Sequence, residues 1–144
     1  MSDRYQHTQA GTLMIAVLCL GAAAAAAAAF MNPSAGRWLG LAIALGCGVL
    51  AWLFSSLTVI VNGSELEWYF GPGAWKYRMA RGDIANVSIV RNSVLNGFGI
   101  RMRPGFRLYN VSGLDAVELQ LKNGEIRRIG TDDARGLAAA LRGE

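Results

Sequence analysis

Charged side chains are almost absent from the first part of this 144-residue chain, because residues 8–64 carry a single charge, Arg37. That charge separates two apolar runs, residues 11–30 and 38–57. Each run has the roughly 20 residues that a helix needs to cross the ~30 Å hydrocarbon core of a bilayer. The sequence therefore predicts a transmembrane helical hairpin over residues 11–57.

Basic residues are also scarce before the first run. A cleaved secretory signal has a basic segment and an apolar stretch of about 7 to 15 residues, whereas here Arg4 stands alone before a longer run. We interpret residues 1–10 as an N-terminal tail and the first run as an uncleaved anchor. Arg4 and Lys76 flank the hairpin, against Arg37 in its turn, which favours cytoplasmic N- and C-termini in a multi-pass protein.

Cysteine is limited to Cys19 and Cys47, each near the middle of its apolar run. A thiol there behaves as a small hydrophobic group, and two thiols without other ligands make an incomplete zinc site, although a disulfide or metal pair is an alternative. The part after the hairpin has no cysteine to form disulfides in an oxidising compartment. We expect a cytoplasmic domain and neither metal nor cofactor.

Catalytic motifs are missing as well. The single histidine, His7, falls in the predicted tail, and the chain has no G-x-S-x-G, Walker A or G-x-G-x-x-G sequence. Asp115, Asp132 and Asp133 are conceivable metal ligands, but a helix N-terminus attracts carboxylates through its dipole. We therefore expect a protein that is not an enzyme.

Small residues recur every four positions in the second apolar run. Such a stripe marks a close helix–helix contact in lipid. It either receives the alanine-rich first helix within the hairpin or forms a docking face for another membrane protein or a second copy of the chain. The predicted helix-packing residues are Gly36, Gly40, Ala44 and Gly48.

From Thr58 onward apolar residues alternate with polar ones, which predicts strands. Residues 58–61 and 65–70 flank Asn62-Gly63, the preferred pair of a type I′ hairpin turn. Residues 117–122 and 125–129 predict a second hairpin, and alternating segments between the two bring the total to about seven strands. A short amphipathic helix capped by Asp132 and stopped by Gly143 ends the chain.

This order of elements after two spans resembles the bacterial pleckstrin-homology-like (PH-like) membrane proteins. The resemblance rests on TVIVNGSELEWYF, WKYRMARGDIANV, GFGIRMR and AVELQLKNGEIRRIGTDDARGLAAAL. It implies an α+β membrane protein of the bacterial inner membrane, with a cytoplasmic domain over residues 58–144. The implied fold of that domain is a seven-stranded, partly open β-barrel or sandwich capped by the C-terminal helix.

The same resemblance implies non-catalytic binding or scaffolding, and some members of the class are membrane assembly factors. Members that bind phosphoinositides use basic residues in the first hairpin loop. Here that loop is Asn62-Gly63-Ser64 followed by Glu65, which argues against that mechanism.

Arginines are interleaved with aromatic residues in the segment from Arg91 to Tyr109. If they face the membrane, each adds up to about 1 kcal/mol of attraction to anionic lipid headgroups; the alternative is a solvated strand face. Nucleic acid is not an expected partner, since the net charge is only +4 and no recognition motif occurs. The candidate binding residues are Arg91, Phe98, Arg101, Arg103, Phe106, Arg107 and Tyr109.

The second span passes into the first strand without a linker, so the domain should lie against the membrane and meet partners laterally. We expect an accessory or assembly protein that presents the PH-like domain to an integral membrane protein complex. Two alternatives stay open: a module that senses lipid headgroups or peptides, and a self-associating membrane scaffold.

Overall fold

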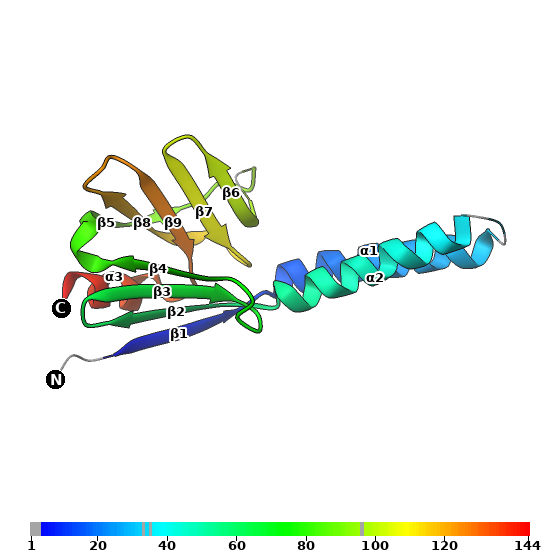
Figure 1. Ribbon diagram of the computed structural model, residues 1–144, viewed down its shortest axis with the longest axis horizontal. Helices are drawn as coiled ribbons and strands as arrows, with labels where there is room; N and C mark the ends of the chain where they lie inside the picture. The colour runs from blue at the N-terminus through cyan, green and yellow to red at the C-terminus, as the bar shows by residue number, and fades with distance from the viewer. Residues whose placement is uncertain (1–3, 33, 35, 96) are drawn as a thin grey trace.

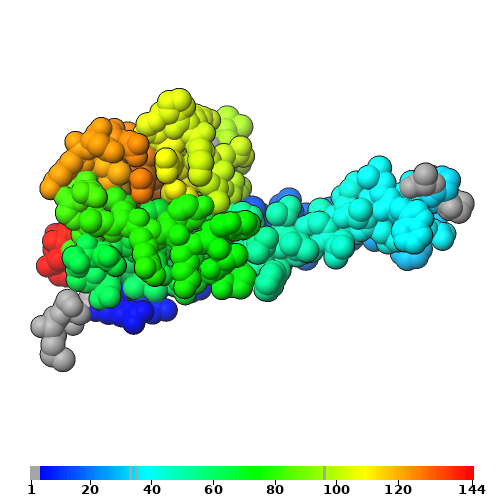
Figure 2. Space-filling model, in the orientation of Figure 1, coloured from blue at the N-terminus to red at the C-terminus, as the bar shows by residue number. Residues whose placement is uncertain are grey.

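The computed structural model describes residues 4–32, 34, 36–95 and 97–144. A β domain occupies one end of the molecule, and a pair of helices projects from it (Figure 1). Figure 2 shows that the helices stand clear of the domain along most of their length, and 6% of each apolar helical window is buried. The domain therefore does not cover most of the apolar side chains of the helices, which need another apolar environment.

The two helices are α1, Thr12–Met31, and α2, Gly36–Leu53, and both are long and apolar enough to cross a membrane. The predicted second helix extended to Leu57, and its end was wrong. Leu57 belongs to a strand, pairs with Phe70 and is 1% exposed. Because a buried strand is as apolar as a spanning helix, residues 54–57 carry no charge that would mark the boundary, and Ser55 and Ser56 are its only polar side chains.

The first sheet is antiparallel and has the order β1-β2-β3-β4. Its strands are β1 (Tyr5–Ala10), β2 (Ser56–Asn62), β3 (Glu65–Phe70) and β4 (Lys76–Ala80). Residues 1–10 were predicted as a tail, whereas β1 pairs with β2 over six residues, from Tyr5↔Val61 to Ala10↔Ser56. Its partner β2 follows both helices in sequence, so no pattern in the neighbouring residues predicts β1.

The predicted hairpin of β2 and β3 is present, but its turn lies one residue later. Asn62 pairs with Glu65, so the two-residue loop is Gly63-Ser64. Gly63 has φ +48°, while positive φ is confined to glycines among the described residues. A type I′ turn needs positive φ at both central positions, so the predicted turn type was wrong.

The second sheet has the order β5-β8-β9-β7-β6 and follows a short 3₁₀ turn, η1, at Arg81–Asp83. Its strands are β5 (Ile84–Arg91), β6 (Gly99–Arg103), β7 (Phe106–Asn110), β8 (Asp115–Leu121) and β9 (Ile126–Gly130). All its pairings are antiparallel except β7 with β9. The described residues thus form nine strands in two sheets without a closed barrel, a correction to the seven-stranded prediction.

The core lies between the two sheets and is closed by helix α3, Ala134–Arg142. Gly143 ends this helix with φ +80°, as predicted, but its N-cap is Asp133 rather than Asp132. The Asp133 carboxylate accepts a hydrogen bond from the Gly136 backbone N–H at 3.0 Å. The largest fully buried side chains are Trp68, Tyr109, Phe70, Leu57, Leu66, Leu108, Leu119, Ile129 and Leu137.

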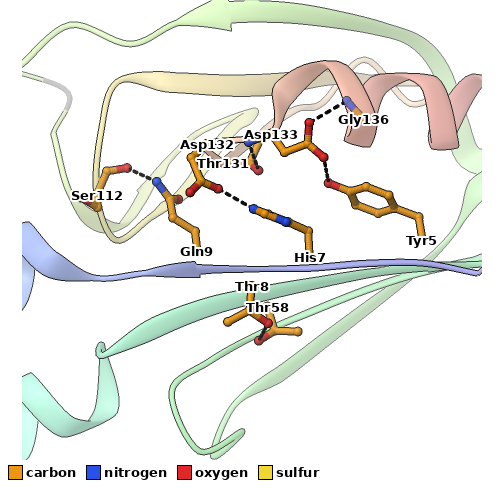
Figure 3. Close-up of polar contacts among 10 residues, drawn as sticks. All are labelled: Tyr5, His7, Thr8, Gln9, Thr58, Ser112, Thr131, Asp132, Asp133 and Gly136. Atoms are coloured by element: carbon orange, nitrogen blue, oxygen red, sulfur yellow. Dashed lines mark hydrogen bonds and ion pairs between the residues drawn. The ribbon is translucent and has the colours of Figure 1, made fainter.

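Polar side chains join β1 to the start of α3 (Figure 3). The Tyr5 hydroxyl donates to Asp133 Oδ2 at 3.0 Å, and His7 Nε2 lies 2.5 Å from Asp132 Oδ1. Burial raises the pKa of the Tyr5 phenol, and the hydrogen bond to Asp133 raises it further. Residues 5–10 of the segment predicted as a tail are therefore part of the folded domain, while residues 1–3 lie outside the described residues.

Candidate binding surfaces

The helices join the domain through very short connections. Ala10 ends β1 two residues before α1 begins, and Leu53 ends α2 three residues before β2 begins. The backbone N–H of Gly11 donates to the carbonyl of Ser55 at 2.7 Å, which ties the two connections together. A Cβ on Gly71 would lie 2.5 Å from the Leu53 carbonyl oxygen, so the β3–β4 turn also packs on the end of α2.

Exposed apolar side chains occur near this junction. Trp75 in the β3–β4 turn is 49% exposed, and Val94 and Leu95 in the β5–β6 loop are 70% and 93% exposed. Both segments lie on the side of the domain from which the helices project (Figure 1). Trp38 and Trp52, near the two ends of α2, are exposed as well. Tryptophan favours the membrane–water interface, so the positions of these two residues are a further sequence signal for a spanning α2.

The β5–β6 loop is fastened at both ends. The buried Asn92 accepts a hydrogen bond from Arg128 Nη1 at 3.2 Å, and the Asn110 side chain donates to the Gly97 carbonyl at 3.2 Å. Arg128 also donates to Glu118 at 2.6 Å and lies over the Phe106 ring. These hydrogen bonds hold the two ends of the loop in place, and Val94 and Leu95 are exposed between them.

The structure brings together part of the predicted arginine–aromatic surface. Arg101 and Arg103 lie on the outer face of β6, and Arg103 pairs with the half-buried Phe106. Together with Leu95 they surround a hollow of about 20 Å³. Phe98 lies half-buried in the β5–β6 loop.

The other predicted members lie elsewhere. Arg91 is at the end of β5, 4.0 Å from Asp115. Tyr109 is fully buried against Trp68 and Tyr77, with ring centroids 5.2 and 4.9 Å away, so it belongs to the core. Alternation along a strand places it on the opposite face from Phe106.

Arg107 shares the inner face of its strand with Tyr109. Burial raises the pKa of the nearby Tyr77, and the Arg107 guanidinium partly opposes that rise. On the neighbouring parallel strand β9, Arg127 lies in register with Arg107. Two arginines therefore stand side by side at the open margin between the sheets.

A cleft of about 430 Å³ opens between β4 and the β8–β9 hairpin. The Arg127 side chain is 19% exposed and lies 3.6 Å from Glu125, while its Nε is buried without a hydrogen-bond partner in the described structure. Arg78 is paired with Glu67 at 2.8 Å. The lining residues are Arg78, Met79, Asp83, Leu121, Lys122, Asn123 and Arg127.

The cleft was not predicted from the sequence, although the sequence holds one signal for it. Arg127 stands two residues before the core residue Ile129, so strand alternation turns it toward the interior. The cleft also requires β4 and β9, which are distant in sequence and belong to different sheets.

The four predicted packing residues of α2 do not all lie in the contact with α1. Gly40 is buried against α1, where an added Cβ would lie 2.8 Å from the Ala29 Cβ, and Ala44 is half-buried. Gly36 and Gly48 are exposed, and a Cβ on Gly48 would have no neighbour within 4 Å. The close helix contact therefore lies at Gly40.

Within the described residues, no three His, Cys, Asp or Glu side chains are grouped as a metal site. Asp115, Asp132 and Asp133 line a broad hollow of about 450 Å³, and Cys19 and Cys47 are free thiols. A comparison of the chain with models of protein families and with curated proteins gives no match.

Proposed function

We propose that this chain is a non-enzymatic protein of the bacterial inner membrane. In this proposal the helical hairpin crosses the membrane and presents a PH-like domain at the cytoplasmic face. The domain then acts as an accessory or assembly factor for a membrane protein complex.

The observation that carries the proposal is the short, hydrogen-bonded junction between helices and sheet. The bond from Gly11 N–H to the Ser55 carbonyl and the packing of Gly71 on Leu53 leave the domain little freedom to swing. A flexible linker would let the domain search a volume, whereas this junction fixes its orientation relative to the helices. Such geometry suits a partner in the same membrane.

The exposed residues near the junction support contact with the bilayer. Trp75, Val94 and Leu95 expose 49%, 70% and 93% of their surface, and apolar exposure gathered on one side of a domain is typical of a membrane or protein contact. At a membrane surface, burial of each large apolar side chain is worth about 1.5–3 kcal/mol if it is complete. These side chains would hold the domain down beside its partner.

The test is to extract the full chain from its native membranes in mild detergent and identify co-purifying proteins by mass spectrometry. We expect a stoichiometric membrane protein complex. A glycine–serine insertion between Gly11 and Thr12, matched by one between Ser55 and Ser56, should weaken its recovery. The same insertion in the α1–α2 connection is the control. Recovery of the chain alone would overturn the proposal.

A lipid-sensing role is the second candidate, favoured by Leu95 beside Arg101 and Arg103. Apolar insertion and basic attraction to anionic headgroups commonly act together at membrane surfaces. Replacing both arginines with glutamine should reduce binding to anionic vesicles of a chain lacking the hairpin. Equal, salt-insensitive binding by the variant would count against this role.

A further inference from the structure

We propose that the cleft between β4 and the β8–β9 hairpin binds an acidic, extended segment of a partner protein, which adds as a strand to the free edge of β4. This inference rests on the proposed binding function and assigns it a site. The site is separate from the outer arginines on β6.

Basic side chains with hydrogen-bond donors to spare give the site its preference for negative charge, although Arg127 lies 3.6 Å from Glu125 through its Nη2. The buried Nε of Arg127 has no acceptor within the described structure. Arg107 stands in register beside Arg127, and neighbouring like charges on paired strands destabilise each other unless an anion lies between them. Lys122 adds a further exposed cation without an ion pair among the described residues. Asp83 is the one carboxylate in the cleft lining.

The edge of β4 supplies the backbone groups for strand addition. β4 pairs with β3 on one side, and on the other side it has no strand partner in the described part of the chain. An edge strand presents unpaired N–H and C=O groups that an extended peptide can bind. Met79 and Leu121 line the same cleft, so alternate apolar side chains of the peptide would find contacts beside the cations.

The position of the cleft favours a protein segment over lipid headgroups. It is built from the end of β4, the turn η1 and the β8–β9 hairpin, which lie at the end of the domain away from the helices (Figure 1). If the helices span the bilayer, the headgroups are at the opposite end. The ligand would then come from the cytoplasmic part of a neighbouring protein.

The experiment measures binding of a fluorescent peptide to the full chain in detergent micelles. The peptide has about six residues that alternate glutamate and valine, the usual length of a strand. Loss of one charge-assisted hydrogen bond should weaken binding about tenfold in Arg127→Gln and in Lys122→Gln. Lys122 is exposed, so its variant tests the site even if Arg127→Gln folds poorly. Arg135→Gln, an exposed change of equal charge on α3, should bind like the original chain.

Two modified probes separate the alternatives. A peptide methylated on its backbone nitrogens should lose binding, because it cannot pair with β4. If it binds equally well and inorganic phosphate displaces it, the cleft is a small-anion site and the proposal fails. The proposal also fails if both cleft variants bind the unmodified peptide normally, or if they change only binding to nanodiscs of anionic lipid. A complex that co-purifies equally with the cleft variants would leave the proposed function standing and refute this site.

Discussion

Asp133 is expected to hold the N-terminal strand and the C-terminal helix together. Its two carboxylate oxygens serve different elements: Oδ1 caps α3 at the Gly136 N–H, and Oδ2 accepts from the Tyr5 hydroxyl of β1. Asp133→Ala removes both contacts at once. Loss of an N-cap costs about 1 kcal/mol, and a part-buried hydroxyl left without its acceptor costs about 1–3 kcal/mol more. We therefore expect a total cost of about 2–4 kcal/mol.

Asp132→Ala is the matched control, because the neighbouring aspartate contacts His7 from a mostly exposed position. An exposed pair is worth at most about 1 kcal/mol. The assay is amide hydrogen exchange of the full chain in detergent, read separately for peptides from β1, from α3 and from β8. Exchange in β1 and α3 should accelerate strongly in Asp133→Ala and weakly in Asp132→Ala.

A double-mutant cycle with Tyr5→Phe isolates the contact between β1 and the cap. If Asp133 acts on both elements, the effects of the two substitutions should fall short of adding, with a coupling of about 0.5–3 kcal/mol. Equal exchange in the two aspartate variants, or strictly additive effects in the cycle, would refute this account of how β1 is attached.

Three further predictions concern the same framework. Folding raises the pKa of Tyr5 above its ordinary value of 10.0. The stabilisation that the protonated Tyr5 provides should therefore be present below pH 10.0 and decline as the pH rises further. Tyr5→Phe should flatten that decline when thermal unfolding is measured against pH. Gly40→Leu should force the two helices apart at a cost of about 1–3 kcal/mol, whereas Gly48→Leu should preserve the hairpin. Cysteine crosslinking between α1 and α2 within one chain measures this difference. If Gly48→Leu abolishes crosslinks between two chains, the face of α2 that carries Gly48 is the self-association surface. A chain in which a short turn joins Ala10 directly to Ser56 should be soluble and monomeric by sedimentation, while a chain that begins at Ser56 should aggregate through the uncovered edge of β2.

Sequence patterns predicted the features that depend on neighbouring residues. The apolar runs predicted both helices, alternation predicted the β2–β3 and β8–β9 hairpins, and helical spacing of apolar residues predicted α3. These signals are local, since each pattern is contained within the residues of the helix or hairpin that it predicts. The PH-like character of the domain stays a prediction, because the two sheets match it only in outline.

The features that were missed depend on distant partners. Tyr5–Ala10 is a largely polar strand whose partner lies beyond both helices, and the parallel β7–β9 pair joins strands from separate hairpins. The end of α2 was missed because helix and buried strand are equally apolar. The placement of Tyr109 in the core and of Arg127 at the cleft follows from strand faces, which become definite once register is known.

The pairing of β1 with β2 has a consequence for the biogenesis of the protein. The two strands are separated in sequence by α1 and α2, yet they form adjacent members of one sheet. If the helices are inserted into a membrane, β1 leaves the ribosome first and has no partner until both spans have crossed and β2 has been synthesised. A hairpin that inserted only one helix would place the strands on opposite sides of the bilayer. Completion of the sheet would thus act as a checkpoint for correct insertion, so that misinserted chains stay unfolded and open to proteolysis.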